Sequence, residues 1–233
     1  MILDIDLQTH TRFSQECGWV PPETLIRRAK RVGLDGVAIT DHNTMDGIDP
    51  ARLAADDGFL IIPAEEIDTT EGQIIGLFLT EPIDPWQPPA EVLNTIHRQG
   101  GLALAPHPFD NLRDGLETIA SHADHIDAVE VLNSRCIRDA YNARARTFAE
   151  SHRLPMTGGS DAHFARELGR AYTRVAVRSP PDRDGSSQYH EPMLGAVRRA
   201  IEDGDIKPAG GRGTLAVHAG TKMVKLLNRL RNA

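Results

Sequence analysis

Short apolar runs alternate with amphipathic stretches along most of this chain. The apolar runs, each of which predicts a β-strand, cover residues 2–7, 36–40, 59–63, 73–79, 102–105, 128–132 and 173–177. The amphipathic stretches, which predict helices, cover residues 22–30, 45–55, 90–99, 139–151 and 193–202. Strands that alternate with helices in this way are typical of a largely parallel sheet with helical connections.

Turn-forming residues separate these elements. Residues 69–72 form a polar turn between two apolar runs and predict a hairpin or closely spaced strands, and the proline-rich stretch 82–89 predicts a loop. Residues 179–188 also predict a loop. Seven or eight strands, most of them followed by helices, favour a barrel or barrel-like sheet over a flat, doubly wound sheet. No G-x-G-x-x-G motif follows the first strand, which argues against a dinucleotide-binding fold.

The bulk composition fits an ordinary globular domain. The 233 residues are 40% hydrophobic and 25% charged, which is enough to bury a core without disulfides. The only cysteines are Cys17 and Cys136, and so low a number favours a reducing compartment. The N-terminus lacks the basic and apolar segments of a secretion signal, and no run approaches the roughly 20 apolar residues of a membrane span. We therefore expect a cytoplasmic protein without a membrane partner.

Charge is distributed unevenly between the body of the chain and its end. The net charge is −7, yet from residue 206 onward there are six Lys or Arg and no Asp or Glu. We therefore expect a barrel domain over residues 1–205 and a basic tail over 206–233, with a helix at 214–230 that packs on the acidic barrel. An acidic body is not typical of a general nucleic-acid binder, although the tail could contact phosphates or a partner.

Polar signals stand at the ends of four apolar runs. They are the segments Asp6-Leu7-Gln8-Thr9-His10, Thr40-Asp41-His42-Asn43, Ala105-Pro106-His107-Pro108 and Gly159-Ser160-Asp161-Ala162-His163. In barrel folds the carboxyl ends of the strands carry the chemistry, so these histidines should meet at one mouth. Glu66 follows another strand, and Glu16 lies in the loop after the first signal. One histidine at a strand end is more often structural, but a set with carboxylates suits Zn, Mn or Fe.

The ordered series of motifs resembles the PHP (polymerase and histidinol phosphatase) family. The resemblance covers roughly residues 1–178 and includes the four signals together with Pro63-Ala64-Glu65-Glu66-Ile67. It implies a distorted seven-stranded (β/α) barrel, TIM-like in character, that holds up to three metal ions. Many members hydrolyse phosphoesters. The implied cofactors are one to three divalent ions per chain, Zn, Mn or Fe, with Mg as a further candidate.

The resemblance also assigns ligands to three metal positions. One position would use His10, Glu66 and Asp161 with help from residue 8, and Glu66 would bridge to a second position that His107 completes. The third would use His42, His163 and Glu16. Asp41 and Asn43 would orient these ligands. A metal-activated water would be the nucleophile, and Asp161, His163 and His42 are the residues expected to take part in catalysis.

Two glutamines depart from the family pattern. Gln8 stands where the first histidine of a His-x-His pair is usual, and Gln73 stands where relatives tend to have a histidine after the bridging glutamate. A glutamine carbonyl oxygen is a poorer ligand than imidazole for Zn or Fe. The first two metal positions could therefore be weak, empty or suited to a harder ion such as Mn or Mg.

Several further residues are candidates for contacting the substrate. Arg135, Arg166 and Arg170 follow late strands, and a guanidinium matches phosphate oxygens with two parallel hydrogen bonds. The alternative is that these arginines are solvated or paired with acids. Glu130, on the strand before Arg135, could reach the mouth as an acid or an extra ligand.

Three interpretations of function remain open from the sequence. The first is a metal-dependent phosphoesterase that acts on a small phosphorylated metabolite, a nucleotide or a short oligonucleotide. The second, supported by Gln8 and Gln73, is a PHP-like domain with weakened catalysis that binds metal or phosphate or serves in regulation. The third, an amide or C–N hydrolase, rests only on the chemistry that similar barrels host. The sequence does not indicate an oligomeric state.

Overall fold

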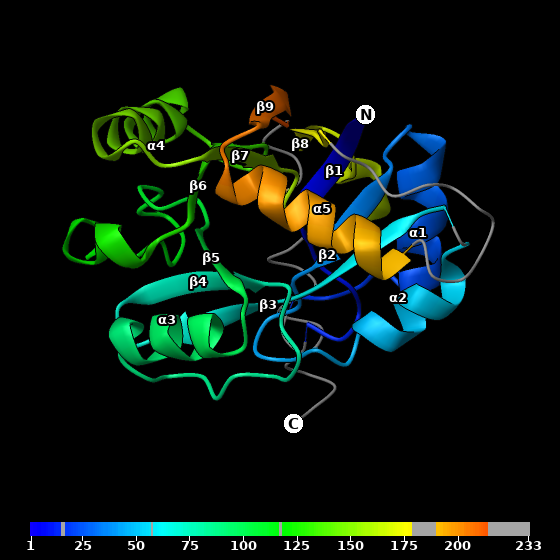
Figure 1. Cartoon of the computed structure of the whole chain (residues 1–233), viewed down its shortest axis with the longest axis horizontal. Helices are drawn as coiled ribbons and strands as arrows, with labels where there is room; N and C mark the ends of the chain where they lie inside the picture. The colour runs from blue at the N-terminus through cyan, green and yellow to red at the C-terminus, as the bar shows by residue number, and fades with distance from the viewer. Residues whose placement is uncertain (15–16, 57, 117, 179–189, 214–233) are drawn as a thin grey trace.

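The computed structural model describes residues 1–14, 17–56, 58–116, 118–178 and 190–213. Within them, one nine-stranded sheet is the main feature (Figure 1). Its strands are β1 (Ile2–Thr9), β2 (Gly36–Ile39), β3 (Leu60–Thr69), β4 (Gly72–Leu77), β5 (Leu102–Ala105), β6 (Ala128–Asn133), β7 (Met156–Gly159), β8 (Ala171–Ala176) and β9 (Ile206–Gly210). The strand order is β7-β6-β5-β4-β3-β2-β1-β8-β9.

The sheet curls into a nearly closed barrel. Strands β1, β2 and β3 run parallel, as do β5, β6 and β7, whereas β4 is antiparallel to both of its neighbours. At the seam, the Gly158 N–H donates to the Thr173 hydroxyl at 3.0 Å, and that hydroxyl donates back to the Gly158 carbonyl at 2.8 Å. The barrel and the hairpin at residues 69–72 are confirmed. The antiparallel strands β4, β8 and β9 account for the distortion from a regular (β/α) barrel.

Helices connect the strands and cover the barrel. They are α1 (Pro22–Arg31), α2 (Ile48–Ala54), α3 (Pro89–Arg98), α4 (Asp139–His152) and α5 (His190–Glu202), with the 3-10 helices η1 (Ile119–His125) and η2 (Ala165–Glu167). Helix α1 begins with a proline, carries Glu23 in its first turn and ends in three basic residues. That order matches the helix dipole. Helices α1 and α2 pack on β2 and β3, whereas α3 and η1 pack near β4 and β5.

One end of the barrel is closed by apolar packing. Met193, Val197 and Ile201 of α5 belong to one buried cluster with the residues of β1, β3 and β5 that face them. In Figure 1, α5 crosses in front of the end of β1. The same strand faces turn polar toward their carboxyl ends, where Glu66 follows Ala64 on β3. Alternation of side chains along each strand therefore brings acidic groups into the opposite mouth.

The end of the chain, predicted to be a basic tail over 206–233, is described only in its first part. Residues Ile206–Gly210 form β9, which pairs with β8 as part of the sheet. The predicted helix at 214–230 and the predicted loop at 179–188 lie outside the described residues. No helix within the described ranges is long and apolar enough to cross a membrane.

Candidate metal centre

Six predicted ligands meet at the polar mouth of the barrel. His10, His42, Glu66, His107, Asp161 and His163 come from loops or strand ends that are far apart in sequence. All are buried except His42, which is 22% exposed at its side chain. Glu66 and Asp161 lie at the centre of the group. In each of these two carboxylates, one oxygen faces a first set of side chains and the other oxygen faces a second set.

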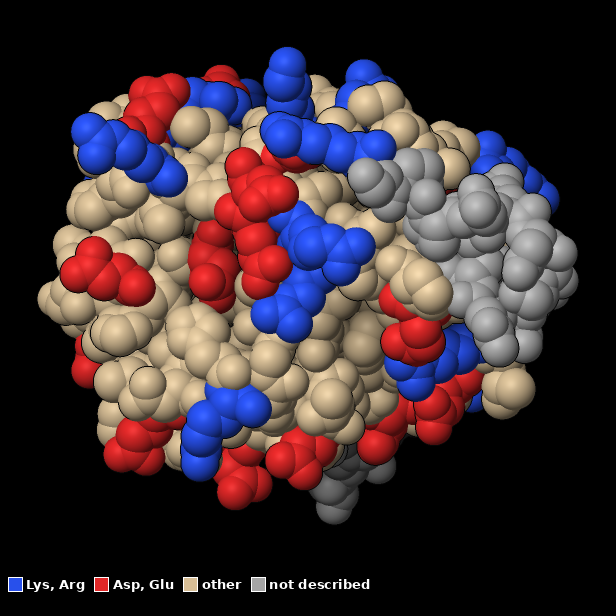
Figure 2. Space-filling view, viewed as in Figure 1, with Lys and Arg blue, Asp and Glu red and all other residues tan. Residues whose placement is uncertain are grey.

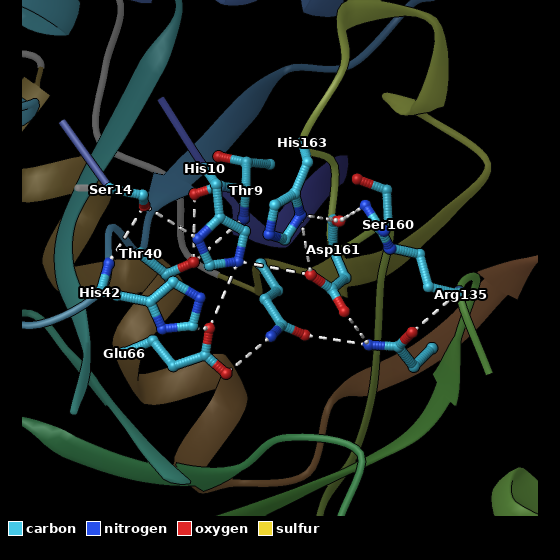
Figure 3. A network of polar contacts seen from close by, with 12 residues as sticks. Thr9, His10, Ser14, Thr40, His42, Glu66, Arg135, Ser160, Asp161 and His163 are labelled. Atoms are coloured by element: carbon cyan, nitrogen blue, oxygen red, sulfur yellow. Dashed lines mark hydrogen bonds and ion pairs between the residues drawn. The ribbon is translucent and has the colours of Figure 1, made fainter. Parts of the chain in front are cut away.

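The first set, here called the histidine side, consists of His10, His42 and His163. Nε2 of His10 lies 3.3 Å from Glu66 Oε2 and 3.3 Å from Asp161 Oδ1. Nδ1 of His42 lies 3.6 Å from Glu66 Oε2, and Nδ1 of His163 lies 3.4 Å from Asp161 Oδ1. One ring nitrogen from each histidine falls within 4.8 Å of the other two. Figure 3 shows His10 between Glu66, Asp161 and Ser14.

Hydrogen bonds behind the rings decide which nitrogens present lone pairs. The Ser14 hydroxyl donates its one proton to Asp41 Oδ1 at 2.8 Å, so it accepts from Nδ1–H of His10 at 3.3 Å. His163 donates from Nδ1 to the backbone carbonyl of Asp161 at 2.9 Å. Nε2 of both rings is then a lone-pair donor to a metal, the arrangement that metal-ligating histidines show.

This arrangement fits a cation. Nε2 of His10 is buried and has no hydrogen-bond partner among the described residues, yet two carboxylate oxygens lie 3.3 Å away. A lone pair that faces two carboxylate oxygens in a buried site is repulsive unless a positive charge lies between them. Imidazole nitrogen with carboxylate oxygen is the ligand set of Zn, Mn and Fe. The histidine side therefore fits a divalent metal ion.

The second set, here called the amide side, consists of Gln8, Asn133 and Arg113. Gln8 Nε2 donates to Glu66 Oε1 at 3.1 Å, and Asn133 Nδ2 lies within hydrogen-bond distance of Gln8 Oε1, Glu130 Oε2 and Asp161 Oδ2. Arg113 Nη1 pairs with Asp161 Oδ2. The N–H groups of these three residues face the shared carboxylates.

His107 and Glu130 border the amide side. His107 Nε2 lies 3.3 Å from Glu66 Oε1, and the His107 backbone N–H donates to Glu130 Oε2 at 2.9 Å. His107 and Asp161 both have positive φ, at 31° and 53°. Such backbone conformations are costly for residues other than glycine, and they are common at functional sites where the surrounding structure holds them in place.

Burial and charge shift the ionisation of the central groups. Burial, together with the nearby Asp161, raises the pKa of Glu66 well above its usual value. Burial also acts to raise the pKa of Asp161, but Arg113 and further neighbouring groups together outweigh it and hold that pKa well below the usual range. Burial lowers the pKa of His107 and of His163, so both are neutral at pH 7. Neutral imidazoles are the form that binds metal.

The remaining predicted ligands and orienting residues lie close by, with one outside the described ranges. Gln73 Nε2 donates to Asp68 Oδ1 at 2.8 Å and lies 3.5 Å from His42 Nδ1. Asp41 accepts hydrogen bonds from Thr11 and Ser14, and Asn43 exchanges two hydrogen bonds with Asp68. Glu16 lies outside the described residues.

The three arginines expected to bind substrate lie elsewhere. Arg135 is buried and pairs with Glu167 at 3.2 Å. Arg166 is exposed and lies over the ring of Phe164, and Arg170 is half-buried. None of the three is among the described residues that line the cavity beside the centre. Their role as substrate contacts stays a prediction that the geometry does not favour.

Sequence reasoning missed Arg113. Its guanidinium contacts Asp161, Asp110 at 3.0 Å and Asn133 at 3.1 Å. It belongs to an irregular segment between β5 and η1, where no periodic pattern predicts which way a side chain points. The pair with Asp161 spans 48 residues, so only the fold brings the two together.

A cavity of about 1080 Å³ opens beside the centre. His42, Gln73 and Arg113 line its inner part. Its outer wall includes Trp86, Phe109 and Arg144. Arg144 lies over the Phe109 ring, with its guanidinium carbon 4.7 Å from the ring centroid. The volume accommodates a ligand of nucleotide size or larger.

Comparisons with known proteins find several relatives of this chain. A family model described as PHP-associated matches residues 139–185. The chain is 34% identical over 189 residues to the uncharacterized protein MJ0417 of Methanocaldococcus jannaschii, and the match covers 77% of this chain and 75% of that protein. It is 29% identical over 216 residues to the 5'-3' exoribonuclease Rnm of Salmonella typhimurium, covering 91% of this chain and 64% of the relative.

A solved structure shows the same fold. The barrel aligns with a two-domain protein of Bacteroides vulgatus that contains a predicted PHP-like metal-dependent phosphoesterase, with a TM-score of 0.73 and 20% sequence identity. The alignment covers 91% of this chain and 65% of that protein. The chain thus spans slightly less than two thirds of the length of this protein and of the exoribonuclease.

Proposed function

The chain belongs to the PHP (polymerase and histidinol phosphatase) family, and on that basis we propose that it is a metal-dependent phosphoesterase. The observation that carries the proposal is the histidine side. There, the Nε2 lone pair of His10 faces oxygens of Glu66 and Asp161 in a buried mouth, and ring nitrogens of His42 and His163 lie within 4.8 Å of it and of each other. Such a donor set has no evident structural use without a cation.

The proposed chemistry is hydrolysis by a water molecule. Divalent ions held by His10, Glu66 and Asp161 would supply Lewis acidity, which would activate the water for attack on phosphorus and offset the charge that builds on the phosphate oxygens. Glu66 and Asp161 would hold the ions, and the Ser14–Asp41 pair fixes the orientation of His10. Arg113, at the inner wall of the cavity, stands where a guanidinium can meet a phosphate oxygen.

The proposed substrate is a nucleotide or the end of a short oligonucleotide. Trp86 is 66% exposed and lies with Phe109 in the cavity wall, and aromatic rings of this kind stack on bases. The similarity to a 5'-3' exoribonuclease supports the same class. On the face shown in Figure 2, acidic and basic side chains lie next to one another. That face is the one that α5 covers, at the end of the barrel opposite the mouth, so its charges do not bear on the proposed substrate.

A second candidate function is a metal- or phosphate-binding module with weakened catalysis. Gln8 and Gln73 both use their amide nitrogens to bond carboxylates, Glu66 and Asp68. Neither therefore presents its oxygen to a metal. A centre that holds fewer ions than its relatives could still bind phosphate without turning it over quickly.

The test is a panel of phosphorylated metabolites, mononucleotides and 5'-phosphorylated oligonucleotides, assayed with Mn²⁺, Zn²⁺, Fe²⁺ and Mg²⁺. We expect turnover of a nucleotide or oligonucleotide with at least one metal and its loss in a chelator. Bound metal without turnover of any substrate would favour the binding module. If the protein binds no metal and turns over no substrate, both candidates are contradicted.

A further inference from the structure

The amide side has a fixed polarity that begins at Arg113. A guanidinium can only donate hydrogen bonds, so Asn133 turns its Oδ1 toward Arg113 Nη2 at 3.1 Å. Its Nδ2 then faces Gln8 Oε1 at 3.1 Å, which leaves Gln8 Nε2 to donate to Glu66 Oε1 at 3.1 Å. The arginine thus fixes the orientation of the Asn133 amide, and Asn133 in turn fixes the orientation of the Gln8 amide that donates to Glu66.

This orientation opposes a metal ion on the amide side. An ion bound between Glu66 Oε1 and Asp161 Oδ2 would meet the N–H groups of Gln8, Asn133 and Arg113. His107 Nε2, 3.3 Å from Glu66 Oε1, could offer it a single lone pair. To ligate it, Gln8 would have to turn its amide over and break both of its hydrogen bonds. The amide side therefore does not fit a cation as it stands, whereas the histidine side does.

Each of the three guanidinium nitrogens of Arg113 has a partner in the centre. Its Nε donates to Asp110 at 3.0 Å, and Nη1 pairs with Asp161. Nη2 donates to Asn133 at 3.1 Å and lies 3.5 Å from Cys136 Sγ. Asp110 is 2% exposed and the Arg113 side chain 20% exposed, so the guanidinium sits at the inner end of the cavity rather than in solvent.

We infer that the Arg113 guanidinium takes the place of one metal ion in this centre. Its positive charge, relayed by Asn133 and Gln8, satisfies the oxygens of Asp161 and Glu66 that face away from the histidine side. The inference rests on the proposed metal-dependent function. It leaves at most two metal positions per chain, one fewer than the maximum of three that the family resemblance implies.

The test counts metal ions rather than turnover. Wild type, Arg113→Met and Arg144→Met are equilibrated with Mn²⁺, freed of unbound ion, and measured by elemental analysis and calorimetric titration. Arg144 is the matched control because it lines the same cavity and carries the same charge, but lies over Phe109 without touching the central carboxylates. We expect about one more ion per chain in Arg113→Met than in wild type, and no gain in Arg144→Met.

Each other outcome overturns the inference. Three ions in wild type, or no gain in Arg113→Met, would show that the guanidinium occupies no metal position. An equal gain in Arg144→Met would show only a change in general charge. If Arg113→Met lacks a native circular dichroism spectrum, Arg113→Gln, which keeps a donor for Asp161, takes its place. Failure of both to fold even in Mn²⁺ would also count against the inference, because the ion should replace the lost charge.

The same measurement separates this inference from the proposed function. Ions in wild type without any gain in Arg113→Met would leave the metal-dependent function standing and overturn only the role of Arg113. No ion in wild type or in either variant would remove both.

Discussion

The histidine side and the amide side share the same two carboxylates but present opposite chemistry to them. Oε2 of Glu66 and Oδ1 of Asp161 face the rings of the histidine side. Oε1 and Oδ2 of the same residues receive N–H groups from Gln8, Asn133 and Arg113, with the His107 ring as a further neighbour of Oε1. A carboxylate oxygen that faces lone pairs needs a cation, and one that faces N–H groups is already satisfied. The neighbours of a carboxylate therefore decide whether it acts as a metal ligand.

The largest effect is expected from His10→Ala, which removes the ring at the centre of the histidine side. Loss of its Nε2 should empty or weaken the metal position between Glu66 and Asp161. Metal catalysis contributes several kcal/mol to such reactions, so we expect kcat/KM to fall by about a thousandfold. Elemental analysis and steady-state kinetics measure both effects.

His97→Ala is the matched control for that prediction. His97 is paired with Asp127 at 2.9 Å, near the end of α3, and lies away from the mouth. Metal content and activity should stay at wild-type levels. A His10→Ala protein that keeps its full metal content would show that the histidine side is not where the ion binds.

The next largest effect is expected on the amide side, from Arg113→Met in the absence of metal. The change leaves Asp161 and Asp110 buried without their cationic partner. Breaking a buried ion pair in this way should lower the free energy of unfolding by roughly 3 kcal/mol, and added Mn²⁺ should restore part of the loss. Urea unfolding with and without Mn²⁺ measures it.

The control for this second prediction is Arg174→Met. Arg174 also pairs with an aspartate, Asp4, but its side chain is 49% exposed. A surface pair of this kind contributes less than about 1 kcal/mol. If the two substitutions lower the free energy of unfolding equally, the Arg113–Asp161 pair contributes no more than a surface ion pair. The contrast between the two sides would then be lost.

Most of the fold was predictable because apolar periodicity is a local property. The helix predicted at 139–151 is Asp139–His152, and the hairpin follows from the turn at 69–72. The strand β9 was not expected, because its sequence Ile-Lys-Pro-Ala-Gly has no alternation and only pairing with β8 makes it a strand. Pairing between distant segments is the part of the fold that local patterns do not carry.

The histidine side was predictable for a similar reason, and the amide side was not. His10, His42 and His163 each follow an apolar run, so their strands place them at one mouth. Gln8 was recognised as a departure, but not its hydrogen bonds to Glu66 and Asn133, and Arg113 carried no signal at all. Roles that depend on a partner far away in sequence emerge only when the barrel has brought both together.

A smaller effect is expected from Ser14→Ala, which tests how the histidine side is oriented. Ser14 accepts from His10 Nδ1–H and from the His42 backbone N–H, so its loss frees both histidines to reorient. Removing such a supporting hydrogen bond weakens metal affinity by about 10- to 100-fold. Calorimetric titration with Mn²⁺ measures the change. Ser151→Ala, in the last turn of α4, should leave the affinity unchanged; equal losses in the two variants would remove the role of Ser14.

The smallest effect is expected from Glu130→Gln on the amide side. Burial raises the pKa of Glu130 to about 8, so at pH 7 its carboxyl is largely protonated. Its Oε2 accepts N–H groups from Asn133 and His107, contacts that a glutamine oxygen can keep. We expect the number of bound Mn²⁺ ions to be unchanged and the affinity to vary by less than about threefold.

Glu66→Gln is the matched substitution on the histidine side. Glu66 is also buried and its pKa is also raised by burial, but its Oε2 faces the rings of His10 and His42. A cation there would stabilise the carboxylate, so the same change from acid to amide should lose an ion. If Glu130→Gln loses an ion as well, the amide side binds metal after all, and the neighbours of a carboxylate would not be what decides its role in this centre.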